Sequence, residues 1–388
     1  MSLMKKLLII NNKYRIQGGE DTNIVDELAY LEQYFKIEFL NFDNQGAINL
    51  GEIIGLISNS MRESNKKLIE SLNSFKPDIV YIHNTWFRAN LGLFKILEKR
   101  NIETIVKLHN LRYDCTKSLL SKGHFGNEVF CPKCGLTKNR FQIVNNYFKD
   151  SKIKSIIMNK YGSKYFKILK NSPIKIIVLN KFHKENLIRL GIPEEKISIS
   201  YNPIKLNSEI TYDKLSNYVV YAGAVIDTKG IKELINAWLN VDKNNLDLLI
   251  IGEGEKKSIL EKQYSHKQIK FLGYKENKEV LDYIRKSRAV VTATKMFEGQ
   301  PRLLCEASSL GVPSIYPSFG GMDEYFPKNY NLSFEQYNYK DLENKIELIQ
   351  DPNFIEQESL KAYDHINNLL NETKLKDRFD KVIEKNEE

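Results

Sequence analysis

Two glutamates lie eight residues apart on either side of an expected helix start. Glu298 and Glu306 enclose Gly299-Gln300-Pro301, which follows a predicted strand at 289–292. Proline suits the first turn of a helix because its missing N–H would have no partner there. The amides and dipole of such a helix attract anions at the carboxyl ends of parallel strands. Two carboxylates beside an anion could bind hydroxyls of a sugar and a ribose, although spacing alone equally fits a solvated helix residue and a loop charge.

Short apolar runs alternate with amphipathic stretches along the chain. The runs predict strands in two sets, at 6–10, 37–42, 79–83, 104–108 and 174–179, then at 218–222, 246–251, 269–272, 289–292 and 314–316. Helices are predicted between them at 22–35, 91–100, 231–239, 256–263, 278–286 and 302–310. Strands that alternate with helices form parallel sheets, so we predict an α/β protein with two Rossmann-like, doubly wound domains.

The expected boundary between the domains lies in a turn-rich stretch that begins at Tyr201-Asn202-Pro203. We therefore place the N-terminal domain at 1–205 and the C-terminal domain at 206–388. The stretch 356–382 has a helical composition and could pack back on the N-terminal domain.

Composition narrows the class of protein. The 388 residues are 42% hydrophobic and 28% charged, which is ordinary for a globular protein and excludes a disordered or fibrous chain. There is no run of eighteen apolar residues and no signal-peptide cleavage site near the start, so we expect a cytoplasmic protein. The 58 basic and 49 acidic residues give a net charge of +9, which favours phosphates, nucleic acid or an anionic membrane as partners.

Further motifs occur in a fixed order around the two glutamates. Taken together, they resemble the retaining, nucleotide-sugar-dependent glycosyltransferases of family 4, within the group 1 glycosyltransferases, which have the GT-B fold. The matching segments are Gly18-Gly19-Glu20, 81–84, 108–110, 179–204, 221–223, 229–230, 251–254, 271–273 and 320–324. The resemblance covers nearly the whole chain. It implies that the two domains face each other across a cleft, the first binding the acceptor and the second the nucleotide sugar.

The resemblance also implies residue roles. Lys229 would neutralise the β-phosphate of the donor, Glu306 would hold the ribose diol, and Glu298 would bind hydroxyls of the donor sugar. His109 would contact that sugar from the opposite domain, unless it is a satisfied core histidine. The implied catalytic residues are His109, Lys229 and Glu298, and the implied donor-binding residues are Gly18, Gly19, Gly223, Lys229, Gly299, Gln300, Arg302, Leu303 and Glu306.

One position departs from the family pattern. The family usually has an arginine directly after the glycine at Gly223, where this chain has Ala224. Arg302 is our candidate substitute, because a guanidinium can grip a phosphate through two hydrogen bonds. We see no D-x-D pair suited to a divalent cation, so we expect catalysis without a metal cofactor.

Two features of the first half are not explained by these roles. Cys115, Cys131 and Cys134 have spacing suited to a structural zinc site, and free thiols in a loop are the alternative. The stretch 138–170 is basic and rich in aromatic residues. Such a stretch could lie on an anionic membrane surface, and a solvated lysine-rich helix pair explains it equally well.

The resemblance implies an enzyme that transfers a hexose or N-acetylhexosamine with retention. The donor would be a UDP- or GDP-sugar, and the acceptor a glycan or lipid-linked glycan in cell-surface polysaccharide biosynthesis. We expect a cytoplasmic enzyme, with peripheral binding to the inner membrane face as a further expectation. The alternatives are a GT-B-fold sugar-nucleotide 2-epimerase and a nucleic-acid-binding protein. The latter leaves the glycine loops and the E-x7-E spacing unexplained, so no nucleic acid partner is expected.

Overall fold

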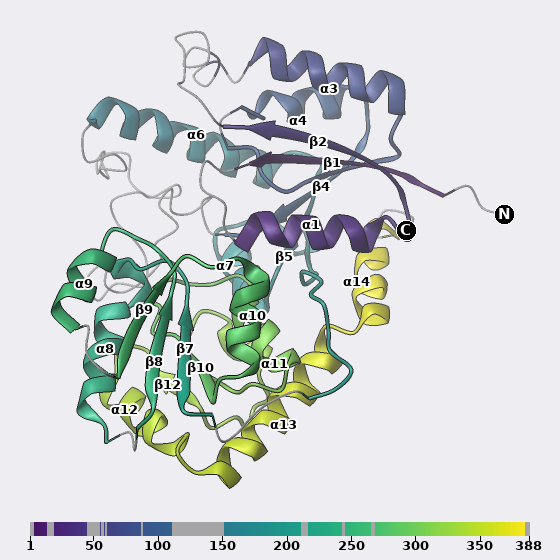
Figure 1. Ribbon diagram of the computed structural model, residues 1–388. Coiled ribbons are helices and arrows are strands. Elements are labelled where there is room, and N and C mark those ends of the chain that lie inside the picture. The colour runs from purple at the N-terminus through teal and green to yellow at the C-terminus, as the bar shows by residue number, and fades with distance from the viewer. Residues whose placement is uncertain are drawn as a thin grey trace. The chain divides into compact units, whose positions relative to one another are not determined.

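The computed structural model describes residues 4–13, 19–44, 55, 58, 60–86, 88–110, 151–210, 216–242, 245–264 and 268–384. The chain divides into two compact units, and the division falls between Pro203 and Ile204. The chain returns to the first unit at Leu375, so the end of the chain belongs with the N-terminal half. Within the described residues each unit contains one six-stranded sheet, and these are the two α/β domains that the sequence predicts (Figure 1).

The sheet of the first unit has the strand order β2-β1-β3-β4-β5-β6, and every pair in it is parallel. Its central strands are buried on both faces, as the continuous apolar run from Leu7 to Ile10 illustrates with four fully buried side chains. The strands are β1 (Lys6–Lys13), β2 (Lys36–Asp43), β3 (Ile79–Ile82), β4 (Glu103–Leu108), β5 (Lys175–Val178) and β6 (Ile197–Ile199). Sequence patterns missed β6, because three residues are too few to show a period.

Helices of the first unit connect these parallel strands, as crossover connections require. They are α1 (Gly19–Leu31), α3 (Arg62–Phe75), α4 (Gly92–Lys99), α6 (Lys152–Asn171) and α7 (Lys181–Arg189). Asn180 caps α7 by accepting a hydrogen bond from the backbone N–H of His183 at 2.7 Å. The chain thus reaches α7 directly from the carboxyl end of β5.

The last helix, α14 (Glu372–Glu384), completes the core of the first unit. Its Phe379 packs edge-on against the rings of Phe35 and Tyr81, and Val382 and Ile383 join the same buried cluster. The Nζ of Lys175 donates a hydrogen bond to the carbonyl of Ile383 at 2.7 Å. The single helical stretch expected at 356–382 is two helices, because the chain breaks after α13 (Pro352–Leu369) and the Asn371 side chain accepts from the N–H of Thr373.

The sheet of the second unit has the order β12-β11-β10-β7-β8-β9 and is also parallel. Chain order therefore reverses between the neighbours β7 and β10, which is the switch point of a doubly wound sheet. The strands are β7 (Tyr218–Ala222), β8 (Asp247–Ile251), β9 (Ile269–Gly273), β10 (Ala289–Val291), β11 (Ser314–Ser318) and β12 (Ser333–Glu335). Its helices are α8 (Ile231–Asn240), α9 (Lys257–Tyr264), α10 (Asn277–Arg285), α11 (Arg302–Ser309), α12 (Tyr339–Leu348) and α13.

Candidate active site

The switch point of the second unit joins the loops that follow β7 and β10. In open α/β sheets, ligands bind at this point, beyond the carboxyl ends of the strands. The loop after β7 contains Gly223 and a short 3-10 helix (Asp227–Lys229), and the loop after β10 leads to Glu298 and α11. The sequence-predicted donor residues of this unit therefore lie on these two loops or on α11.

Gly230 allows these two loops to touch. It has a φ of +65°, and a Cβ at this position would lie 1.9 Å from the carbonyl oxygen of Ala293. The backbone N–H of Lys295 also donates to the carbonyl of Thr228 at 2.9 Å. A glycine is needed here because any side chain would collide with the opposite backbone, and the resulting contact places Lys229 next to the β10 loop.

Lys229 and Glu298 form an ion pair across the two loops. The Nζ of Lys229 lies 2.5 Å from Oε1 of Glu298, and the side chains are 27% and 26% exposed. The hydroxyl of Thr294 donates to the same carboxylate oxygen at 3.3 Å. Burial and the charge of Glu298 together raise the pKa of Tyr221, whose hydroxyl donates to the carbonyl of Ala224. The pair is thus fixed by its surroundings but still reachable from solvent.

A second ion pair lies on α11. The Nε and a terminal nitrogen of Arg302 each lie 2.8 Å from Oε1 of Glu306, one helical turn further on. The two side chains are only 13% and 8% exposed. The idea that Glu306 is a solvated helix residue is therefore wrong. Pro301 directly precedes the helix at its N-cap position instead of lying within the first turn.

The remaining predicted residues of this unit lie close to α11 in the chain. The carbonyl of Gly299 accepts from the hydroxyl of Tyr325 at 3.2 Å, which fixes the loop before the helix. Gln300 is buried and hydrogen-bonds Cys305, while Leu303 is half-buried in the first turn. Cys305 itself is fully buried in the core, and burial raises its pKa.

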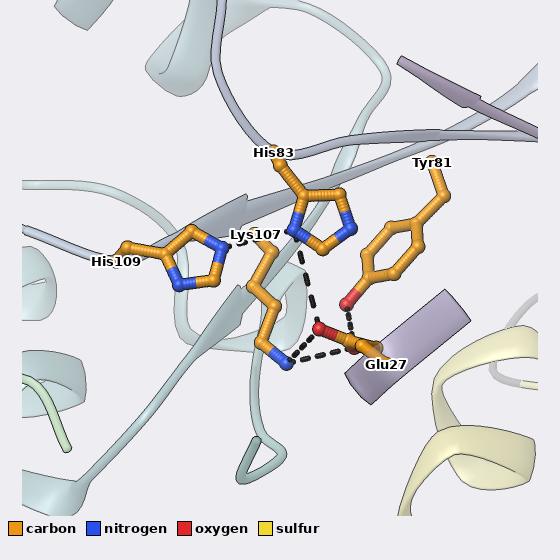
Figure 2. A network of polar contacts seen from close by, with 5 residues as sticks. All are labelled: Glu27, Tyr81, His83, Lys107 and His109. Atoms are coloured by element: carbon orange, nitrogen blue, oxygen red, sulfur yellow. Dashed lines mark hydrogen bonds and ion pairs between the residues drawn. The ribbon is translucent and has the colours of Figure 1, made fainter. Parts of the chain in front are cut away.

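The first unit contains a separate polar network built around Glu27 of α1 (Figure 2). The Nζ of Lys107 lies 2.8 Å from both carboxylate oxygens of Glu27, and the hydroxyl of Tyr81 donates to Oε1 at 2.7 Å. The Nδ1 of His83 lies 4.0 Å from Oε2 of Glu27 and 2.9 Å from the Nε2 of His109. His109 therefore hydrogen-bonds His83, whose ring lies beside the Glu27 carboxylate.

Burial sets the protonation of this network. Burial lowers the pKa of His83 well below 6.5, and the positive charge of Lys107 lowers it further. The pKa of His109 is also well below 6.5, mainly because of burial and then because of His83 and Lys107. Burial likewise lowers the pKa of Lys107, against the opposing effect of Glu27, and raises that of Tyr81. Both histidine rings are thus neutral at pH 7.

The sequence reasoning singled out His83 and His109 but missed Glu27, Tyr81 and Lys107 as parts of one site. The available signal was a lysine within the apolar strand run Ile105-Val106-Lys107-Leu108, where a charge needs a buried partner. Gly19 is the first residue of α1. Gly18 and the predicted metal ligands Cys115, Cys131 and Cys134 lie outside the described residues.

Two parallel Rossmann-like sheets, each with polar groups at its switch point, define the GT-B class of fold. Solved structures share it. A crystal structure of HepE from Anabaena in complex with UDP-glucose aligns with a TM-score of 0.66 at 16% identity, covering 97% of this chain and 99% of HepE. A TarM mutant from S. aureus, solved with fondaparinux, alpha-GlcNAc-glycerol and UDP, aligns with a TM-score of 0.57 at 17% identity, covering 78% of this chain and 55% of TarM. The predicted fold class is confirmed.

The sequence comparisons match part of the chain to a family. Residues 206–366, nearly the whole second unit, match the family described as "Glycosyl transferases group 1". The amylovoran biosynthesis glycosyltransferase AmsD of Erwinia amylovora is 32% identical over 106 residues, which is 27% of this chain and 30% of the length of AmsD. The resemblance to group 1 glycosyltransferases is confirmed for this part of the chain. The narrower assignment to family 4 stays a prediction.

The sequence predicts contact with a membrane surface and no helix that spans the membrane. Within the described part of the chain, no helix combines the length and the apolar character needed to cross a bilayer. Within the basic stretch at 138–170, residues 138–150 lie outside the described residues, and 152–170 belong to α6, whose Tyr161, Tyr165 and Phe166 are buried. The proposed contact of this stretch with lipid stays a prediction.

Proposed function

We propose that this chain transfers a hexose or N-acetylhexosamine from a nucleotide-diphosphate sugar to a glycan or lipid-linked glycan. The observation that carries the proposal is the pair of cation–carboxylate contacts at the switch point of the second unit. Lys229 with Glu298 and Arg302 with Glu306 supply cations for a diphosphate beside carboxylates for hydroxyls. Both kinds of group are needed to hold a sugar nucleotide, which is anionic at its centre and rich in hydroxyls at its ends.

Donor binding would redistribute the existing contacts. Lys229 now neutralises Glu298, and a diphosphate would compete for the ammonium group. Once Lys229 turns to the phosphate, the Glu298 carboxylate becomes available as an acceptor for donor sugar hydroxyls. The partial exposure of both side chains supports such an exchange, because neither charge has to leave a dry interior.

The proposed reaction proceeds on one face of the sugar. The bond between the anomeric carbon and the β-phosphate oxygen breaks, and the acceptor oxygen bonds to the same face of that carbon. The departing phosphate takes the acceptor proton, so the configuration is retained without a covalent enzyme intermediate. Lys229 would stabilise the charge that develops on the diphosphate, and we propose that no metal is needed for this step.

Arg302 is the proposed second cation on the diphosphate. The family position after Gly223 is an exposed alanine, Ala224, while Arg302 begins the helix that follows the β10 loop. Its contact with Glu306 would then serve to hold Glu306 in place until the donor arrives. The helix dipole favours a phosphate at the same end.

The partners are proposed from chemistry and from relatives. The solved structures of HepE with UDP-glucose and TarM with UDP support UDP as the nucleotide, with GDP as the alternative. The match to a glycosyltransferase of amylovoran biosynthesis supports a role in polysaccharide assembly. We further propose that the first unit binds the acceptor, that His109 contacts the donor sugar, and that the enzyme acts in the cytoplasm at the inner membrane face. A structural zinc on Cys115, Cys131 and Cys134 is a separate proposal.

A thermal-shift panel tests the donor class first. A ligand that binds only the native state raises the melting temperature in proportion to its affinity and concentration. We expect a UDP- or GDP-sugar to stabilise the protein in the presence of EDTA, and release of the nucleoside diphosphate to accelerate when a glycan acceptor is added. Proton NMR of the product then reports whether the anomeric configuration is retained. An inverted product or a strict need for a divalent cation would disprove that part of the proposal.

A further inference from the structure

The buried ion pair between Glu27 and Lys107 has no role in the donor site of the second unit. Its side chains are 5% and 0% exposed, and the ammonium group bridges both carboxylate oxygens at 2.8 Å. Burying two opposite charges gives little net stability compared with apolar residues of the same size. Stability alone therefore does not explain why this buried pair is present.

The pair lies next to two histidines that point at one another. His83 has its Nδ1 at 4.0 Å from Glu27 and at 2.9 Å from the Nε2 of His109. Figure 2 shows Lys107 and Tyr81 converging on the Glu27 carboxylate, with His83 turned toward both Glu27 and His109. The Nδ1 of His109 is buried and, among the described residues, has no hydrogen-bond partner. The network thus ends on a buried ring nitrogen whose hydrogen-bonding capacity is not used by the described residues.

The hydrogen bond between the rings restricts their protonation. One facing nitrogen must donate and the other must accept, so the two rings cannot both be cationic without losing this bond. Removing either member of the ion pair would leave one uncompensated charge beside the two rings. Glu27 without Lys107 would draw a proton onto His83, whereas Lys107 without Glu27 would leave an uncompensated cation beside both rings.

We propose that Glu27 and Lys107 are positioning residues whose opposite charges offset each other beside His83 and His109, so that neither charge moves a proton on these buried rings and His109 meets the donor sugar as an uncharged imidazole. This inference rests on the proposed function. Glycosyl transfer passes through a transition state with positive charge near the anomeric carbon. An imidazolium at that place would oppose this charge, whereas a neutral ring can hydrogen-bond a sugar hydroxyl without electrostatic cost.

Four other ionisable groups face His109 from the elements around it. They are Glu27 on α1, His83 at the end of β3, Lys107 on β4 and His183 on α7. Burial lowers the pKa of His183 to about 3, so this ring is neutral as well. Tyr81 on β3 completes the network through Glu27, and burial and Glu27 keep it protonated. Among these described groups, Glu27 and Lys107 form an ion pair, so the two charges nearest to the rings are opposite.

Three variants separate charge compensation from a merely structural role. Lys107→Met leaves the Glu27 charge alone, Glu27→Gln leaves the Lys107 charge alone, and the double variant removes both. Lys175→Met is the matched control, because Lys175 forms a largely buried ion pair with Glu103 at 2.6 Å in the same sheet. The histidine ring nitrogens are followed by long-range proton–nitrogen NMR on histidine-labelled protein, and turnover is measured from pH 5.5 to 8.5.

In the wild type, we expect neither His83 nor His109 to titrate between pH 5.5 and 8.5. In Lys107→Met, a proton should enter the pair within this range, and turnover at pH 6 should fall at least tenfold below its value at pH 8.5. Turnover should not fall in this way at pH 6 in the double variant or in Lys175→Met. Wild-type rings that titrate near pH 6.5, or the same fall in turnover in the double variant, would overturn the inference.

The histidine spectra also distinguish failure of the proposed function from failure of this inference. If no donor and acceptor support transfer while the histidine titrations change as described, the proposed function fails and the charge compensation stands. If transfer occurs but Lys107→Met has wild-type histidine spectra and an unchanged pH profile, the inference alone fails. Should Lys107→Met not fold, the wild-type titration and the uncharged double variant still decide between these outcomes.

Discussion

The two units hold lysine–carboxylate pairs of opposite character. In the second unit, Lys229 and Glu298 are each about one quarter exposed and lie on two loops. In the first unit, Lys107 is fully buried, lies on a central strand and is held by both oxygens of Glu27. The same residue types thus form one partly exposed contact and one buried contact. The difference between the two contacts comes from burial and from the supporting element, not from residue type.

The largest expected difference is in stability. Removing one partner of a buried pair leaves an uncompensated charge, so Lys107→Met should lower the free energy of unfolding by about 3–5 kcal/mol. Lys229→Met breaks a partly exposed pair and should change it by less than about 1 kcal/mol. The only tryptophans are Trp86 in the first unit and Trp238 in the second, so Trp238→Phe and Trp86→Phe backgrounds report the units separately in urea. Equal losses for the two variants would contradict the comparison.

The next effect is on turnover. Lys229→Ala removes the cation proposed for the departing diphosphate, and loss of one such group typically lowers turnover about 100- to 1,000-fold. Lys256→Ala is a matched control, because Lys256 pairs with Asp227 at 2.9 Å near the same loop but is more exposed and has no proposed catalytic role. The two are compared by steady-state kinetics with a saturating acceptor. A loss of similar size in both variants would mean that general surface charge, not the position of Lys229, supports the reaction.

A smaller effect should appear in how the stability of the first unit depends on pH. The folded-state pKa values of His83, His109 and His183 lie below the value of about 6.5 in unfolded chains. Below pH 6.5 the unfolded state therefore binds more protons, and each histidine should reduce stability by about 1.4 kcal/mol per pH unit as pH falls.

For His183, this slope should extend down to its folded-state pKa of about 3. The test is urea unfolding at pH 6.5 and 5.5, followed by Trp86 fluorescence in the wild type and in His183→Gln. The free energy of unfolding should depend less steeply on pH in His183→Gln than in the wild type, by the equivalent of about one bound proton. An identical slope in both proteins would show that His183 is protonated in the folded state too.

The smallest effect concerns Arg302. If its guanidinium binds the diphosphate, Arg302→Ala should weaken binding of the nucleoside diphosphate roughly tenfold, or about 1.4 kcal/mol. Arg302→Lys keeps the charge but not the paired hydrogen bonds and should recover only part of the loss. Calorimetric titration measures both. Unchanged affinity and turnover in Arg302→Ala would remove this residue from the donor site.

The sequence predicted most of the fold, because parallel strands buried on both faces leave long apolar runs. It missed β6 and β12, which have three residues each, and it merged α13 with α14 because the whole stretch has a helical composition. Residues on adjacent loops, such as Lys229 and Glu298, were predictable from the motif resemblance. The partnership of Glu27 with Lys107 joins residues 80 positions apart, and only the strand order brings them together.

The contact between Arg302 and Glu306 was equally unpredictable, although the two residues are only four positions apart. The place of Arg302 at the start of a helix could be read from Pro301, but its contact with Glu306 depends on rotamers and on burial by neighbouring elements. The near-complete burial of Glu306 could not be derived from spacing, since a helix position two turns from a loop can face either core or solvent.

The most direct test of the proposed donor site is calorimetric titration of wild-type protein and Lys229→Ala with UDP, GDP and the two parent nucleosides, all in EDTA. We predict that one nucleoside diphosphate binds saturably and far more tightly than its nucleoside. Lys229→Ala should lose most of that advantage while the nucleoside binds as before. If neither diphosphate binds more tightly than its nucleoside, or if Lys229→Ala binds it like the wild type, the donor site proposed at the switch point of the second unit is wrong.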